Sequence, residues 1–262
     1  MIKIFNFLDR DFSLSKRQVL FAALALLIVG FGLRYGYSLM RDRAPRDEQF
    51  YIEIVEKINN NDKSWYKEYE LPPLVPLTAS VLCHVGFSAE NSLRLLNMLY
   101  SIIWIGVMFF LCRDVFDSNK AGLFGMAIAA FNPYSARLAC QILREPLYLL
   151  IFTLCLWCTV LIIKGKCGNF LYPAIVGVLT VLGFFTRIEG IEIIVFVPLA
   201  AVVVYLQYNK MYFWKCFATC AVFFLTIASL VAVLIVSGNY YLNEVVLLRL
   251  NEYYRLFAGG HL

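Results

Sequence analysis

The sequence has few of the residues, and none of the motifs, on which most soluble enzymes rely. It contains only two histidines in 262 residues, and no cysteine–histidine spacing that would hold zinc. It also lacks a GxGxxG pattern, a P-loop pattern and a GxSxG pattern. These absences argue against the zinc enzymes, the dinucleotide and nucleoside-triphosphate enzymes and the serine hydrolases.

Charged residues are scarce as well, at 16% of the chain, whereas apolar residues make up 61%. A soluble domain is nearer ~45–50% apolar. The mean hydropathy is +0.72, and the apolar residues form long runs instead of short alternations. This composition predicts an all-α, polytopic integral membrane protein. The net charge of +5 does not indicate nucleic acid as a partner, because lysines and arginines at the ends of apolar runs set membrane orientation.

The eight cysteines do not predict a disulfide framework. Cys155 and Cys158 have CxxC spacing, but they lie within a run long enough to be a membrane helix. We expect them to pack as small apolar side chains and not to serve redox or metal chemistry.

Seven apolar runs are expected to cross the membrane, since a membrane helix needs ~20 mostly apolar residues. Arg34, near the end of the first run, is expected to snorkel to the interface. One run is short, but Gly122 and Gly125 predict a closely packed inner helix there. An eighth run, 72–87, is marginal in length and begins with prolines. The seven expected spans are 18–40, 95–112, 121–134, 146–163, 170–186, 193–206 and 212–237.

The positions of the basic residues decide against an eighth span. With the N-terminus inside, seven spans put ten lysines and arginines in the inner loops and three in the short outer loops, whereas eight spans give eight and six. We therefore expect 41–94 to be one long outer loop, with 72–87 lying on the outer surface as an amphipathic or re-entrant helix. Residues 1–237 then form one membrane module, and 238–262 form an amphipathic interfacial tail.

This topology, chosen on positive charge alone, also gathers acidic residues on the outer side. The acidic groups are Asp47 with Glu48, Glu145 beside Arg144, and Glu189 with Glu192 after Arg187.

Asp47 and Glu48 follow the first span and begin a segment with helical spacing of apolar residues. We expect them in the first turn of an amphipathic helix, where the helix dipole favours carboxylates. Such a pair is often only a solvated face, but a carboxylate at a membrane interface can also accept a proton from an incoming hydroxyl. The apolar positions are Phe50, Tyr51, Ile54, Val55 and Ile58.

Glu145 and Arg187 also stand at span ends. Glu145 precedes Pro146, which is an ordinary way to begin a helix, yet ionisable groups near hydrocarbon are costly and are often functional. Arg187 ends an apolar run and is followed by Glu189 and Glu192. It either forms an interfacial salt bridge or binds a phosphate.

Several segments, in order, resemble the polyprenyl- and dolichyl-phosphate-dependent glycosyltransferases of the GT-C superfamily. The nearest branch holds the protein mannosyltransferases, aminoarabinose transferases and lipopolysaccharide-core transferases. The likeness covers roughly residues 17–194. The segments are RDEQFYIEIVEKI, LPPLVPLTASVLCHVGFSAENSLRLLNMLYS, CRDVFDSNKAGLFGMAIAAFNPYSARLACQILREPLYLL and FFTRIEGI. In the last of them, Ile188 stands where the family usually has proline.

The resemblance implies a seven-span module with juxtamembrane helices in the first outer loop, and a sugar on a lipid phosphate as donor. Asp47 matches the catalytic acid of the first loop, Glu48 is its neighbour, and Glu145 matches the second-loop acid. We expect Asp47 to act as general base. Glu48 and Glu145 would orient the acceptor or hold a divalent metal, Mg²⁺ or Mn²⁺. The substrate-binding residues are expected to be Arg187, Arg144, Arg137, Glu189 and Tyr51.

Membrane lipids and an acceptor glycan, lipid or protein complete the expected partners. The expected location is the bacterial inner membrane, with the endoplasmic reticulum as the alternative. Two other functions stay open. A transporter or lipid flippase would carry charges in mid-span, where this chain has few. A truncated, non-catalytic relative is the other, because the family usually carries more spans.

Overall fold

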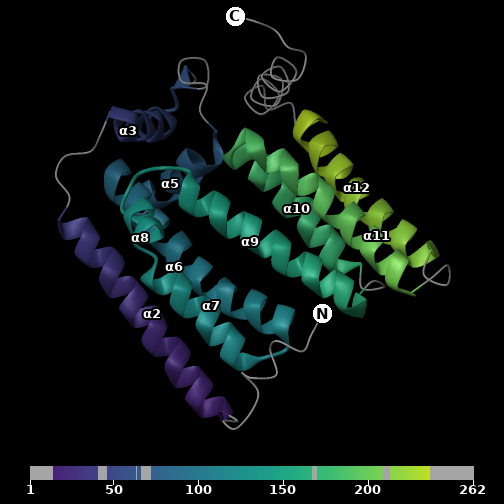
Figure 1. Ribbon diagram of the computed structural model, residues 1–262. Coiled ribbons are helices and arrows are strands. Elements are labelled where there is room, and N and C mark those ends of the chain that lie inside the picture. Colours follow the sequence, from purple (N-terminus) through teal and green to yellow (C-terminus); the bar gives the residue numbers. More distant parts are fainter. Residues whose placement is uncertain are drawn as a thin grey trace, which may run out of the picture.

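The computed structural model describes residues 14–40, 46–62, 64–65, 72–166, 170–208 and 213–236. Across these residues the secondary structure is helical and contains no β-strand, so the predicted all-α class is confirmed (Figure 1). The predicted tail 238–262 and parts of the predicted outer loop 41–94 lie outside the described residues.

The helices begin at residues that suit helix starts. Ser15 and Ser88 each accept a hydrogen bond from the backbone amide three residues further on, which satisfies a free donor of the first turn. The helices, in chain order, are α2 (Lys16–Leu39), α3 (Arg46–Asn59), α5 (Leu74–Cys83), α6 (Ala89–Phe116), α7 (Asn119–Phe131), α8 (Pro133–Ala139), α9 (Glu145–Leu161), the π-helical turn η1 (Ile162–Lys166), α10 (Leu171–Thr186), the 3-10 helix η2 (Ile188–Val195), α11 (Phe196–Tyr208) and α12 (Phe213–Val236).

Five helical segments among the described residues are long and apolar enough to cross a membrane. Five of the seven expected spans therefore coincide with helices of the length and composition that a crossing needs. The five segments are Lys16–Leu39, Ala89–Phe116, Glu145–Gly165, Glu189–Gln207 and Phe213–Val236.

The other two expected spans form shorter helices, α7 with 13 residues and α10 with 16. At 1.5 Å per residue these are about 20 Å and 24 Å long, less than the ~30 Å hydrocarbon core. The run expected at 121–134 was itself short, and α7 ends three residues before the end of that run. Asn132 has extended backbone and Pro133 opens a new helix, α8. Proline has no N–H for the helix ladder, so the apolar run is divided between two helices.

Side-chain contacts fix the direction of α9 relative to α6. The Trp104 indole donates to the Thr153 hydroxyl at 3.0 Å, and the Trp157 indole donates to Asp114 at 2.7 Å. Because the later residue of α6 contacts the later residue of α9, the two helices run parallel. α7 lies against both α6 and α2, and α9 lies in the middle of the bundle with α2 and α12 on its flanks (Figure 1).

α10 runs antiparallel to α9. A methyl group at Gly183 of α10 would touch Ile151 of α9, and one helical turn further on Arg187 reaches Glu145. The end of the bundle where α9 begins and α10 ends is called here the Glu145 end. The opposite end carries Lys164, which pairs with Asp117 just after α6.

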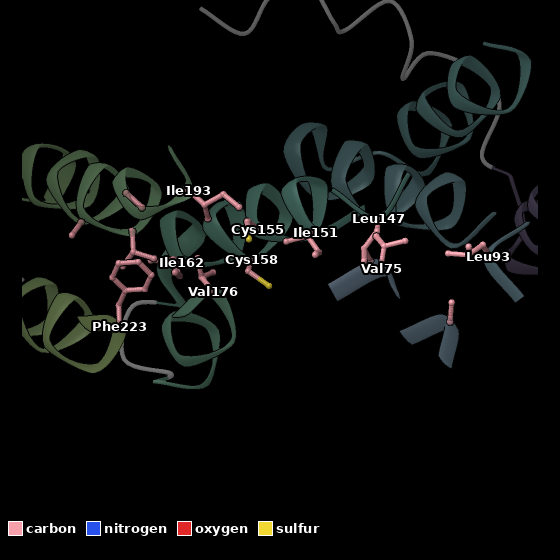
Figure 2. Packing of buried hydrophobic residues seen from close by; sticks show 14 of the residues in the cluster. Val75, Leu93, Leu147, Ile151, Cys155, Cys158, Ile162, Val176, Ile193 and Phe223 are labelled. Carbon is pink, nitrogen blue, oxygen red and sulfur yellow. The ribbon is translucent and has the colours of Figure 1, made fainter. Parts of the chain in front are cut away.

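The main core is formed by apolar side chains from most of the bundle, and Figure 2 shows several of them along α9, α10 and α12. Cys155 and Cys158 are buried in it, as the sequence predicted. Small residues bring α7 close to α6: a methyl group on Gly122 or Gly125 would overlap with Phe109 or Cys112. Between lipid-embedded helices such close packing supplies much of the attraction.

α3 and α5 lie at the Glu145 end (Figure 1). The amphipathic helix predicted after the first span is confirmed as α3, with Asp47 and Glu48 in its first turn. Ile54 of α3 clusters with Trp65 and with Phe185, two residues before Arg187. α5 has ten residues, about 15 Å, which is half of what a crossing needs.

The prediction that Arg34 snorkels to the interface is wrong. Its side chain is fully buried between α2, α6, α7 and α8. All five guanidinium N–H groups have acceptors, and the acceptors are neutral. They are the hydroxyls of Ser101 (2.7 Å) and Ser135 (3.1 Å) and the carbonyls of Gly30 (3.0 Å), Ala130 (3.2 Å) and Ala129 (3.4 Å).

Candidate functional site

An ion-pair cluster at the Glu145 end brings three of the predicted site residues together. Arg187 Nη1 lies 3.1 Å from Glu145 Oε1. The same guanidinium binds Glu189 through two hydrogen bonds, Nη2 to Oε1 at 2.9 Å and Nε to Oε2 at 3.2 Å. Such bidentate arginine–carboxylate pairs fix the relative orientation of the two side chains. The interfacial salt bridge, one of the two alternatives expected for Arg187, is therefore present with Glu189. The pair with Glu145 also joins the end of α10 to α9.

The aromatic ring of Tyr148 supports this cluster from α9. The Arg187 Cζ lies 5.5 Å from the ring centroid, a distance at which the ring face attracts the cation. The Tyr148 hydroxyl lies 3.3 Å from the carbonyl oxygen of Glu189 and donates to it. Hydrogen bonding to Glu189 raises the pKa of the Arg187 guanidinium, so Arg187 carries its charge at every physiological pH.

The turn that presents Arg187 depends on a close backbone approach. Arg187 leaves the α10 helix with extended backbone (φ −149°, ψ 146°), and η2 begins at the next residue. Gly190 packs so tightly against Gly183 that a methyl group on Gly190 would overlap with its backbone. This contact folds η2 back beside α10 and holds Glu189 next to Arg187. In η2, Glu189 and Glu192 lie three residues apart, which is one 3-10 turn.

Glu145 is placed by the bend that precedes α9. Asn97 of α6 donates from Nδ2 to the carbonyls of Gln141 (2.6 Å) and Leu143 (2.9 Å). Pro146 then occupies the first turn of α9, where a proline costs no hydrogen bond. The Glu145 Oε1 atom pairs with Arg187, whereas Oε2 is buried and has no hydrogen-bond partner among the described residues. A buried unpaired carboxylate oxygen is costly. A hydroxyl or another donor that bound beside Oε2 would satisfy it.

The two acids of α3 differ in exposure. The Asp47 side chain is exposed, whereas Glu48 is 1% exposed. Among the described residues, no hydrogen bond or ion pair joins Asp47 to Glu145 or Arg187. The Ile54–Phe185 packing described above puts α3 at the same end of the bundle as Arg187. The predicted site residues therefore share one end of the bundle, and direct contacts join only some of them.

The remaining predicted substrate-binding residues have different surroundings. Arg137 is exposed in α8, and Arg144 is half-buried at the N-cap of α9. Tyr51 is 4% exposed and belongs to the main core cluster, so its ring contributes to packing.

Tyr148 and Asn97 were not expected at the site. For Asn97 the available signal was a lone amide inside an apolar run, because polar groups are costly in such a position.

The carboxylates do not gather into a metal site. Among the described residues, no group of three or more histidine, cysteine, aspartate or glutamate side chains is close enough to hold an ion. Both Glu145 and Glu189 are paired with the Arg187 cation, which disfavours a second cation beside them. The predicted Mg²⁺ or Mn²⁺ does not fit these side chains, and no catalytic step is assigned to it.

Comparisons of the chain with protein-family models, with curated proteins and with solved structures gave no match.

Proposed function

We propose that this protein is a membrane glycosyltransferase that moves a sugar from a polyprenyl-phosphate donor to an acceptor on the outer or lumenal face. The Glu145–Arg187–Glu189 cluster carries the proposal. It holds a permanent cation, and a carboxylate oxygen that has no partner among the described residues, at one end of a bundle of membrane helices. A lipid-linked donor needs this combination at this depth, since its tail lies in the bilayer and its phosphate at the interface.

The proposal includes seven crossings, in a module like that of the GT-C superfamily. α6 and α9 run parallel, and each is long enough to span. A chain that crosses twice in the same direction has to return in between, and α7 with α8 is the segment available for the return. The same reasoning applies to α10, which runs antiparallel to α9 and is followed by the spanning segment Glu189–Gln207. Short helices at these two places fit a locally thinned bilayer or partial burial in protein.

This topology predicts which ends can be labelled from outside. Arg137→Cys and Asp117→Cys are matched probes, since both residues are exposed but lie at opposite ends of the bundle. In a background in which the native cysteines are replaced, an impermeant thiol reagent applied outside intact cells should label position 137 and not position 117. The N-terminus should be inside. Labelling of both positions from the same side would contradict seven crossings.

In the proposed reaction the acceptor hydroxyl gives its proton to Asp47 as its oxygen attacks the anomeric carbon. The bond from that carbon to the phosphate oxygen breaks, and polyprenyl phosphate leaves with the electron pair. One displacement of this kind inverts the anomeric configuration. Asp47 suits the role of base because it is exposed in the first turn of α3, where an incoming acceptor hydroxyl can reach it.

Arg187 is assigned to the departing phosphate. Its hydrogen bonds to Glu145 and Glu189 use three of its five N–H groups. The other two have no acceptor within the described part of the chain and can bind phosphate oxygens. Arg144, and after it Arg137, are the next candidates to add positive charge. A fixed cation at the place where negative charge develops lowers the barrier to reaction. The role of Glu145 is to hold Arg187 in place and to offer Oε2 to the acceptor.

A defined transfer assay tests the proposed function directly. Purified protein in lipid nanodiscs should release polyprenyl phosphate from at least one defined polyprenyl-phosphate sugar when a glycan, lipid or peptide acceptor is present. The expected location, the bacterial inner membrane, makes undecaprenyl-linked donors the first set and dolichyl-linked donors the second. A thermal unfolding curve first has to show that the purified protein is folded. If neither set of donors then yields product, the proposed function is wrong.

A further inference from the structure

The segment 132–144, called here the linker, connects α7 to α9 and ends just before Glu145. It contains the short helix α8 and four residues of irregular bend. Irregular backbone near hydrocarbon is tolerated only where protein groups satisfy its carbonyls and amides. Two fully buried polar side chains from other helices do this for the linker, Arg34 of α2 and Asn97 of α6.

Arg34 supports the point where α7 breaks. The carbonyl of Ala129 loses its helical partner because residue 133 is proline. Arg34 donates to this carbonyl and to that of Ala130, and it also donates to the hydroxyl of Ser135 in the linker. The negative end of the α7 dipole partly balances the buried charge. A further hydrogen bond joins the linker to α2: the Cys140 thiol donates to the backbone carbonyl of Arg34 at 2.9 Å.

Asn97 holds the other half of the linker. Its Nδ2 donates to the carbonyls of Gln141 and Leu143, at 2.6 Å and 2.9 Å. These residues lie in the bend between α8 and α9. Glu145 is only two residues beyond Leu143, so the position of the bend sets the position of the Glu145 carboxylate.

Stability of the bundle alone does not account for these polar side chains. Gly30 and Arg34 are the buried residues of α2, and most of its apolar side chains are exposed. A charged side chain buried inside a bundle of membrane helices is costly, and intramembrane ionisable groups tend to be functional. What an apolar side chain cannot supply is a set of directed hydrogen bonds to the linker.

We propose that Arg34 and Asn97 are positioning residues that fix the linker and thereby hold Glu145 against Arg187. The catalytic consequence rests on the proposed glycosyl transfer, in which Glu145 orients Arg187 and the acceptor. The structural consequence does not depend on it. Without these contacts the bend moves, and the 3.1 Å pair between Glu145 and Arg187 is held less firmly.

Hydrogen–deuterium exchange on the full chain in nanodiscs measures the structural consequence. Asn97→Asp keeps the size of the side chain and removes both donors. Trp157→Phe is the matched control, since it removes a hydrogen bond between α9 and α6, from Trp157 to Asp114, near the end of the bundle opposite the linker. Amides of residues 134–147 should exchange about tenfold faster or more in Asn97→Asp, and at the wild-type rate in the control.

Arg34→Lys is the second variant and serves if Asn97→Asp does not fold. It keeps the charge but cannot supply five directed donors, so it should accelerate exchange in the same amides. Equal exchange in the variants and in Trp157→Phe would show that neither residue positions the linker.

Transfer kinetics separate positioning from simple destabilisation. For Asn97→Asp we expect kcat to fall about tenfold or more with the donor KM within about twofold of wild type, because Arg187 itself is retained. Faster exchange with unchanged kcat would refute the proposal. A wild-type protein without transfer activity would refute the proposed function instead, and the exchange result would still decide whether the linker is positioned.

Discussion

Asp47→Asn is expected to lower the turnover of sugar transfer by about 10²–10⁴-fold, which is the usual contribution of a general base. Asparagine keeps the shape of the side chain, but it cannot accept the proton of the acceptor hydroxyl. Asp47 is exposed, so the substitution should not change folding. Donor affinity should stay at the wild-type value, because the lipid and the phosphate bind other groups. Steady-state kinetics and a donor-binding titration measure the two quantities separately.

Glu56→Gln is the matched control for this prediction. Glu56 is an exposed carboxylate on the same helix, and its loss should leave turnover unchanged. Glu48→Gln should lower turnover less than Asp47→Asn if Glu48 only orients the acceptor. Since Glu48 is buried, its variant requires a thermal unfolding curve beside the kinetics.

The assignment of the base fails if Asp47→Asn keeps near wild-type transfer while Glu48→Gln abolishes it in folded protein. In that case the neighbouring acid accepts the proton. The alignment with the glycosyltransferase motif is then wrong by one residue, although the membrane module is unaffected.

Local features of the fold could be predicted because local spacing causes them. The apolar positions of α3 recur with helical spacing, and the helix forms with the predicted buried side, including Tyr51, Ile54 and Val55. The run 72–87 was marginal in length for a span, and α5 is shorter still. The glycines of α7 were expected to allow close packing, and they do so against α6.

Other features depend on residues far apart in the sequence and could not be predicted from local patterns. The burial of Arg34 requires carbonyls and a hydroxyl about a hundred residues away, at the α7–α8 break. An arginine near the end of an apolar run usually snorkels, and nothing beside it in sequence indicates otherwise. The end of α7 is a smaller and local difference, since Asn132 and Pro133 end the helix at Phe131, three residues before the expected end of the span.

The candidate site shows both situations. The pairing of Arg187 with Glu189 spans two residues and was foreseen as a salt bridge. The pairing of Arg187 with Glu145 spans 42 residues and depends on α9 and α10 being antiparallel neighbours. The contribution of Tyr148 was missed for the same reason. A tyrosine in an apolar run gives no sign that an arginine from the next helix lies over its ring.

Arg187→Ala is expected to weaken donor binding about 10- to 100-fold and to lower kcat/KM by at least as much. The range corresponds to losing hydrogen bonds to a charged group, ~1.5–3 kcal/mol. The variant has a second effect, because it leaves the partly buried Glu145 without its partner and loosens the contact between α9 and α10. Stability and binding therefore have to be separated before the result identifies a phosphate ligand.

The double variant Glu145→Gln/Arg187→Ala makes this separation. It removes the unpaired carboxylate, so it should unfold at a higher temperature than Arg187→Ala alone, closer to wild type. Donor binding should stay as weak as in the single variant, since no group has replaced the guanidinium. Glu145→Gln alone should retain most of the donor affinity, because Glu189 still holds Arg187 through two hydrogen bonds.

Arg94→Ala is the control for a general loss of positive charge. Arg94 pairs with Glu90 on the surface of α6 at 2.7 Å, and exposed pairs of this kind contribute little. Its donor affinity should match wild type. If the double variant recovers both stability and donor binding, Arg187 serves only as a structural link between α9 and α10. The phosphate ligand then has to be sought among Arg144 and Arg137.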